Sequence, residues 1–285
     1  MTGQKIANQH FNAGRCAKLI ALHWAMQRKR YLLAIPAMLG MLLLWFGFIA
    51  LMSRANAMPL FMQEATYYVG ILIVGCLFAS TMFSDLGSRP HGLAFLAIPA
   101  SALEKLLCAI LFSGLVYFTI FNVLYYIVDI PMVNFANHLI AKTHPTWPDG
   151  SQVSSIQVFN AFKGEAGDYY DTHYHVNLLL YFTIQAAFLL GSVYFEKYAF
   201  IKTTVALLIF LGIILVFHVK VINGLMPDGW SRHPFLDWVK DKDTPDMQVV
   251  RLSPQLLSFL GYMLLYGTSP LLWLVTWFRL KEKQV

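Results

Sequence analysis

Long apolar segments constrain this chain more than any other feature of its sequence. A helix needs about 20 mostly apolar residues to cross the hydrocarbon core of a bilayer. Six stretches of the chain meet or approach that length: 31–52, 67–83, 102–128, 176–195, 203–222 and 256–278. A chain segment can cross lipid only when its backbone N–H and C=O groups are hydrogen-bonded within the protein, as they are in a helix. We therefore expect an all-α, polytopic membrane protein with six transmembrane helices.

Composition points to the same class of protein. Only 13% of the 285 residues are charged and the mean hydropathy is +0.56, whereas soluble domains carry roughly 25% charged residues. A net charge of +6 would suggest nucleic acid as the partner of a soluble protein. In a membrane protein it indicates basic residues held on the cytoplasmic side. We therefore expect the lipid bilayer, and no nucleic acid, as a partner.

The distribution of basic residues predicts the orientation of the spans. Six basic residues and no acidic one precede the first span: Lys5, Arg15, Lys18, Arg28, Lys29 and Arg30. Arg279, Lys281 and Lys283 follow the sixth span. Six crossings return the chain to its starting side, so both termini are expected in the cytoplasm. The loops 129–175 and 223–254 then lie outside, and 196–202 lies inside.

The N-terminal segment 1–30 forms a unit distinct from the transmembrane domain 31–285. Ala13, Cys16, Ala17, Ile20 and Trp24 recur at spacings of three and four, which places them on one face of a helix. This pattern suits an elbow helix lying in the membrane interface. Its expected anchors are Arg15, Lys18, Trp24, Arg28, Lys29 and Arg30. An ordinary solvated basic leader is the alternative.

No motif for enzymatic chemistry occurs in the chain. The phosphate-binding G-x-x-x-x-G-K-[ST], the zinc-binding H-E-x-x-H and the nucleophile elbow G-x-S-x-G are absent. We therefore expect no enzyme and no bound cofactor; any ATP and Mg would belong to a partner subunit. Cys16, Cys76 and Cys108 are too far apart in sequence for a zinc motif and are expected to be free and buried.

Two further groups of polar residues have alternative interpretations. His173 and His175 are weak metal-ligand candidates, for which a metal-dependent enzyme is one hypothesis and solvated loop histidines are the default. Asn122 and Gln185 are central polar residues of the spans, and Pro270 should kink the sixth. They are pathway candidates, although such residues also hold helices together.

The hinge between the second and third spans, "FSDLGSRPHGLAFLAIPASALEKLL" (83–107), carries the clearest local signal. Ser101 and Glu104 match the capping box S-x-x-E, which predicts an abrupt helix start at Ser101. The hinge also places Leu93 and Phe95 in a cytoplasmic loop, where apolar side chains need a partner. Asp85, Arg89 and His91 would form the polar rim of this docking surface.

The hinge pattern "LAIPASALEK" and the leader "FNAGRCAKLIALHWAMQRKRYLL" resemble those of type-2 ABC exporter permeases, especially the compact members from Bacteroidetes-like bacteria. The resemblance covers roughly the first 130 residues well and the rest only through the number of spans. It implies an interfacial elbow helix, a coupling helix in the hinge that docks on a separate ABC ATPase subunit, and a second permease copy. The implied location is the bacterial inner (cytoplasmic) membrane, in multi-pass form.

Two hypotheses follow from these observations. The first is the permease subunit of an ATP-driven exporter, whose hinge couples a separate ATPase to substrate movement through docking residues Asp85, Arg89, His91, Leu93, Phe95, Ser101 and Glu104. The second is a non-transporting membrane scaffold or regulatory subunit whose outer loops bind a partner. Neither hypothesis names the substrate, the direction of transport or a homodimer rather than a heterodimer.

Overall fold

The protein is a multi-pass membrane protein built almost entirely of helices. The computed structural model describes residues 11–52, 60–87, 92, 94, 95, 97–143, 155–162, 171–217, 220, 230–232, 238–240, 249–250 and 254–283. Five helical segments within these residues are long and apolar enough to cross a membrane. Their exposed surfaces are rich in Leu, Ile, Val and Phe, as lipid contact requires.

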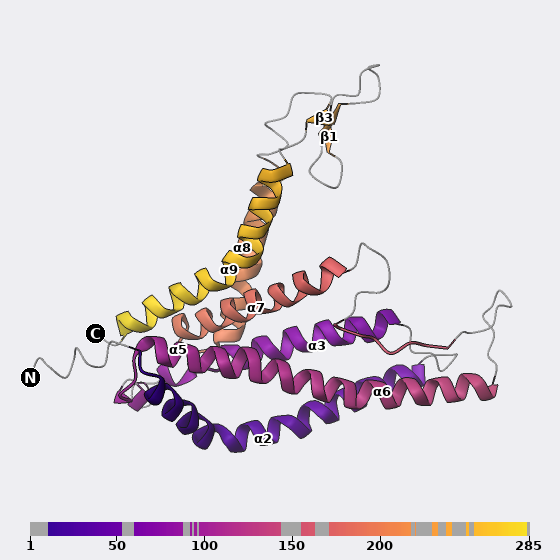
Figure 1. Ribbon diagram of the computed structural model, residues 1–285, viewed down its shortest axis with the longest axis horizontal. Coiled ribbons are helices and arrows are strands. Elements are labelled where there is room, and N and C mark those ends of the chain that lie inside the picture. Colours follow the sequence, from indigo (N-terminus) through magenta and orange to yellow (C-terminus); the bar gives the residue numbers. More distant parts are fainter. Residues whose placement is uncertain are drawn as a thin grey trace, which may run out of the picture.

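The main bundle consists of elongated helices that run side by side (Figure 1). Its elements are α2 (Ala13–Met52), α3 (Leu60–Ser80), α5 (Ala102–Ile110), α6 (Tyr117–Thr143) and α7 (Asp171–Tyr194). Helix α2 packs on α5 and α6, α3 packs on α6 and α7, and α7 also packs on α8 (Ala199–Phe217) and α9 (Pro254–Lys283). Helix α7 therefore joins the bundle to the last two helices.

The elbow and the first span form one continuous helix. Helix α2 begins at Ala13 and runs for 40 residues through Pro36, and Figure 1 shows that it changes direction along its length. A proline inside a helix removes one backbone hydrogen bond and clashes with the preceding turn, so a helix that contains one can bend without ending. The helical pattern predicted from Ala13 to Trp24 is confirmed.

The third span is longer and less regular than its sequence predicts. Helix α5, a π-helical stretch at Leu111–Val116 and α6 together form 42 helical residues, where we expected a span of 102–128. At 1.5 Å per residue this is about 60 Å, twice the hydrocarbon thickness. The first 15 residues of the predicted outer loop, 129–143, are therefore helical and extend α6 beyond the other helices.

Helices α8 and α9 leave the bundle. Figure 1 shows α8 and the first part of α9 projecting from its side, while the second part of α9 turns back along it. Thr203 is the one buried residue of α8. Helix α9 contains Pro270, for which the sequence predicts a kink, and Figure 1 shows that α9 changes direction along its length. Five of the described helical segments are long and apolar enough to cross a membrane, so the sixth span stays a prediction. Between α8 and α9, strands β1 (Trp230–Arg232), β2 (Trp238–Lys240) and β3 (Val249–Val250) form a small antiparallel sheet.

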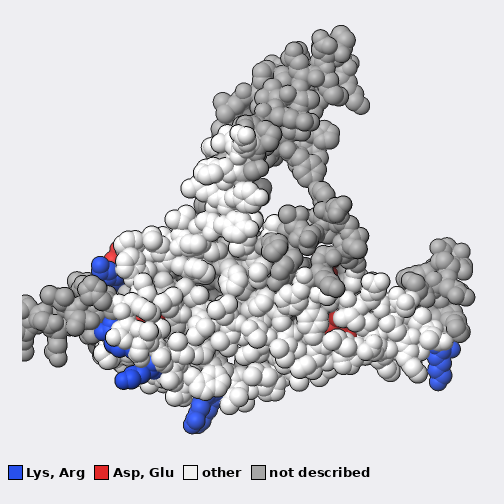
Figure 2. Space-filling view, in the orientation of Figure 1, with Lys and Arg blue, Asp and Glu red and all other residues white. Residues whose placement is uncertain are grey.

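The starts of α2 and α5 and the ends of α7 and α9 meet at one end of the bundle. Leu280 of α9 packs with Ala102 and Leu106 of α5, and the Lys283 ammonium donates to the Val193 carbonyl of α7 over 2.8 Å. Lys and Arg gather at this end in Figure 2. We call it the basic end; its basic residues include Arg15, which binds Glu104 at the start of α5, and Lys283 near the end of α9.

Candidate functional site

The capping box at the start of α5 is present as predicted. Ser101 is the N-cap with extended backbone, and its side-chain oxygen accepts a hydrogen bond from the Glu104 amide at 3.2 Å. The Glu104 carboxylate accepts in return from the Ser101 amide at 2.9 Å. The backbone N–H groups of Ser101 and Glu104, which have no partner within the helix, are both hydrogen-bonded in this way. Both side chains are buried, that of Glu104 completely.

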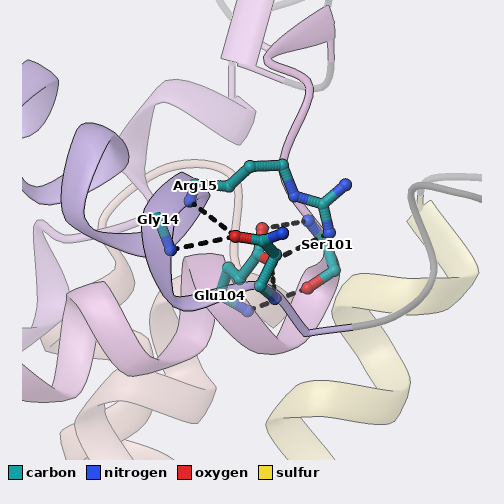
Figure 3. A network of polar contacts seen from close by, with 5 residues as sticks. Gly14, Arg15, Ser101 and Glu104 are labelled. Atoms are coloured by element: carbon teal, nitrogen blue, oxygen red, sulfur yellow. Dashed lines mark hydrogen bonds and ion pairs between the residues drawn. The ribbon is translucent and has the colours of Figure 1, made fainter.

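The same carboxylate also binds the start of α2. Its Oε1 accepts a hydrogen bond from the backbone N–H of Asn12 at 2.8 Å and another from the Arg15 guanidinium at 3.0 Å. Asn12 in turn caps α2, because its side-chain oxygen accepts from the amides of Gly14 and Arg15. One buried carboxylate therefore joins two helix starts that lie about ninety residues apart in the sequence, as Figure 3 shows.

The negative charge of Glu104 suits this position for two reasons. The N–H groups at a helix start carry partial positive charge, and here the starts of α2 and α5 meet at one carboxylate. Arg15 adds a full positive charge, and its side chain is 26% exposed while that of Glu104 is fully covered. Water therefore reaches the Arg15 side of the ion pair but not the Glu104 side. The hydrogen bonds from the backbone N–H groups of Asn12 and Ser101 offset the cost of burying the carboxylate.

The residue next to Glu104 holds the hinge. The Lys105 ammonium donates to the Phe95 carbonyl over 3.0 Å and lies 5.0 Å from the centre of the Phe95 ring. That ring makes an edge contact with Phe83 at 6.0 Å. Lys105 is 3% exposed. These contacts fasten the hinge to α5, whereas Ala94 and Ala97 of the hinge are exposed.

The predicted docking residues fall into three groups. Ser101 and Glu104 are buried and bind this chain's own helix starts. Phe95 is half-buried and packs inward, while Asp85 is half-buried and lines a narrow cleft between α2 and the hinge. Arg89, His91 and Leu93 lie outside the described residues.

The predicted interface anchors divide as well. Lys18, Trp24, Arg28, Lys29 and Arg30 are exposed along α2. Arg15 instead turns toward Glu104.

The underside of the elbow is a packed surface. Leu19 and Tyr31 of α2 are buried against Ala100, Cys108 and Phe112. The Tyr31 hydroxyl and a ring nitrogen of His23 lie 2.6 Å apart. The elbow therefore rests on α5 through apolar contacts in addition to the Glu104 bonds.

The pathway candidates lie on three different helices. Asn122 of α6 accepts from the Tyr67 hydroxyl of α3 at 2.9 Å, a polar link between helices. Gln185 of α7 is 3% exposed, and neither polar atom of its amide has a hydrogen-bond partner among the described residues. Pro270 is exposed on α9.

The remaining candidates add little to a site. The side chains of His173 and His175, the weak metal candidates, lie outside the described part of the structure. The three cysteines are free as predicted; Cys76 and Cys108 are buried and Cys16 is partly so.

Sequence reasoning missed the link between the two helix starts. The S-x-x-E pattern identified Ser101 and Glu104, but nothing local to Asn12 or Arg15 indicates a partner in the hinge. A basic residue within a cluster of basic residues instead suggests a lipid anchor, as predicted for Arg15. Their roles depend on how the elbow folds back onto α5.

The chain matches no family model, no curated protein and no solved structure.

Proposed function

We propose that the chain is the transmembrane permease subunit of an ATP-driven ABC exporter of the bacterial inner membrane, working with a separate ATPase and a second permease copy. The observation that carries this proposal is the Glu104 junction. It joins the elbow, the hinge and the third span at the basic end, which is the end expected to face the cytoplasm. A force applied to the hinge would reach both helices together.

The geometry of the hinge supports a coupling role. Gly92, Ala94, Phe95 and Ala97 have helical backbone, as a short coupling helix would. Lys105 and Phe95 fasten its inner side to α5. A partner that binds the outer side would therefore move a rigid element and not a loose loop. ATP and Mg would be bound by that partner, since this chain has no phosphate-binding loop.

The first test is co-purification. The chain, expressed with its neighbouring reading frames and purified in mild detergent, is expected to bring down an ATPase in stoichiometric amount. Recovery of the folded chain without any ATPase would contradict the proposal.

The second test places charge on the outer side of the hinge. Ala94→Glu and Ala97→Glu alter exposed positions, whereas Phe95→Glu would disrupt inward packing and confound folding with docking. A charge buried in an interface without a partner costs more than about 1.4 kcal/mol, so ATPase binding should weaken at least about tenfold. The matched control is Ala141→Glu, the same change at an exposed position near the far end of α6. Equal effects of all three variants would rule out docking at the hinge.

One observation favours the scaffold as a second candidate function. The segment 155–162, which belongs to the predicted outer loop, is held in a fixed conformation by side chains of α3 and α6. A rigid outer surface suits partner binding. The co-purification experiment separates the two functions, because a scaffold requires no ATPase.

A further inference from the structure

A segment of extended chain closes one side of the bundle away from the basic end. We call this segment, residues 155–162, the strap. The Gln63 side chain donates to the Gln157 carbonyl at 3.1 Å and accepts from the Phe159 amide at 2.8 Å. The Asn137 side chain binds both the amide and the carbonyl of Ile156, each at 2.8 Å. Two side-chain amides thus replace the neighbouring strand that an extended segment normally needs.

The far part of the strap is fixed just as firmly. The Ala161 amide donates to the Tyr126 hydroxyl over 2.8 Å. The Phe159 ring lies 5.5 Å from that of Tyr67 and 6.2 Å from that of Tyr68. Phe159 and Ala161 are both buried. The strap is therefore hydrogen-bonded to α3 and α6 and packed against them as part of the bundle.

Behind the strap lies a cavity of about 240 Å³ between α3, α6 and α7. We call it the aromatic cavity. It is lined by Tyr67, Tyr68, Ile71, Leu72, Phe118, Ala161, Asn177, Leu178, Leu180 and Tyr181. Aromatic and aliphatic side chains make up most of its wall, and none of these residues carries a charge.

The cavity has polar groups at one place and an opening at another. The Asn177 side chain donates to the Tyr68 hydroxyl over 2.8 Å, so one amide and one phenol group face the cavity together. Leu180, which also lines it, has 47% of its surface exposed on α7. Leu180 belongs to a helical segment that is long and apolar enough to cross a membrane, so a ligand that enters past Leu180 would come from the lipid.

We infer that the aromatic cavity binds a small neutral amphiphile that enters from the membrane, with an apolar body and one hydrogen-bonding group such as a hydroxyl. Size supports this class, since a dry apolar cavity of about 150 Å³ in another protein binds benzene. The apolar wall suits a ring or a short alkyl chain, and the Asn177–Tyr68 pair suits a single hydroxyl. A charged head group has no counter-charge among the described lining residues, and its burial there is unfavourable.

Photolabelling of the full chain in lipid nanodiscs tests this inference. The probe is azioctanol, a neutral medium-chain alcohol that carries a photoreactive diazirine, and the matched charged probe is the corresponding diazirine carboxylate. Azioctanol is expected to label the peptides that contain Tyr67, Tyr68 and Tyr181. The carboxylate is expected to leave them unlabelled. Equal labelling by both probes, or labelling spread evenly over the lipid-facing helices, would overturn the assignment.

Three variants locate the label. Ala161→Trp places bulk in the cavity from the strap, and labelling should fall about tenfold because a filled site excludes the probe. Leu178→Trp fills it from α7 and serves if the strap variant fails to fold. Asn177→Leu should lower labelling about fivefold, the effect of one neutral hydrogen bond.

The control is Leu211→Trp, which adds the same residue type on an exposed face of α8. It should leave labelling unchanged. Unchanged labelling in both cavity-filling variants would show that the probe binds elsewhere. This result stands apart from the proposed coupling to an ATPase, since neither the probe nor the variants touch the basic end.

Discussion

Replacing Glu104 by Gln tests whether the buried carboxylate holds the elbow and the third span together. Glu104 accepts three hydrogen bonds through two oxygens, from the Asn12 and Ser101 amides and the Arg15 guanidinium. Gln keeps the shape but has a single acceptor oxygen, so its NH₂ group must face a donor. One buried donor is left unsatisfied, at a cost of about 1–3 kcal/mol.

The ion pair adds to this loss. Breaking a fully buried pair costs about 3–5 kcal/mol, but Arg15 is partly exposed and can bind water instead. We therefore expect Glu104→Gln to lower the free energy of unfolding by about 2–4 kcal/mol in total. The assay is reversible unfolding in mixed micelles, followed by circular dichroism at increasing denaturant.

A double-mutant cycle separates the ion pair from the cap. Arg15→Met keeps the stem of the side chain and removes its charge, and Ser101→Ala removes the cap alone, at a cost of about 1 kcal/mol. Glu104→Gln and Arg15→Met should show a coupling energy of about 0.5–3 kcal/mol, as contacting residues do. If the two losses simply add, the contact between Arg15 and Glu104 carries no energy, and the link between α2 and Glu104 rests on the Asn12 backbone N–H.

Three smaller changes test the packing of α7 and α8. A Cβ at Gly191 would collide with the Thr203 side chain, so Gly191→Ala should cost about 1–3 kcal/mol of stability. A Cβ at Gly212 meets no atom of the described residues, so Gly212→Ala should cost none. Thermal melting compares the two variants. Gln185→Met removes two buried polar atoms that have no hydrogen-bond partner among the described residues and should stabilise the protein by about 1–3 kcal/mol. A loss of transport in this stabilised variant would assign Gln185 to the pathway, and unchanged transport would assign it to packing. Tyr198 adopts a left-handed backbone with φ of 56°, so Tyr198→Gly should raise the melting temperature by relieving about 1 kcal/mol of strain, and a lower melting temperature would contradict that reasoning.

The features that the sequence predicts correctly are local ones. Apolar runs identify the membrane-spanning helices because lipid contact requires a continuous apolar surface. The start of α5 is readable because the capping box is a contact between residues three positions apart. The length of α6 is not readable in the same way, since 129–143 is polar enough to look like a loop. Val133, Ala136 and Ile140 bury one face of it at spacings of three and four, a pattern that a search for long apolar runs alone overlooks.

The π-helical stretch shows a second kind of limit. Leu111–Val116 has no distinctive residue type, yet its wider turn exposes backbone carbonyls that an α-helix would cover. The Tyr181 hydroxyl lies 3.1 Å from the Gly114 carbonyl and 3.4 Å from that of Ser113. This compensation comes from α7, nearly seventy residues further along the chain. Such an irregularity depends on its partner, so no local pattern could have indicated it.

Glu104 makes one contact that is local in sequence and another with a distant segment. The sequence therefore predicts its role as a helix cap but not its role in joining α5 to α2. As a cap, Glu104 serves a neighbour three residues away, and any exposed helix start could carry the same motif. As a junction, it must be buried, because a water-exposed pair with Arg15 would contribute little. Its complete burial therefore marks a contact that stabilises a particular arrangement of elbow and hinge. The exposed cations Lys18, Arg28, Lys29 and Arg30 remain available to anionic lipid, while Arg15 is committed to the protein. The elbow thus has exposed cations and one fixed point on the third span, and a fixed point of this kind is needed if movement of the hinge is to shift both helices.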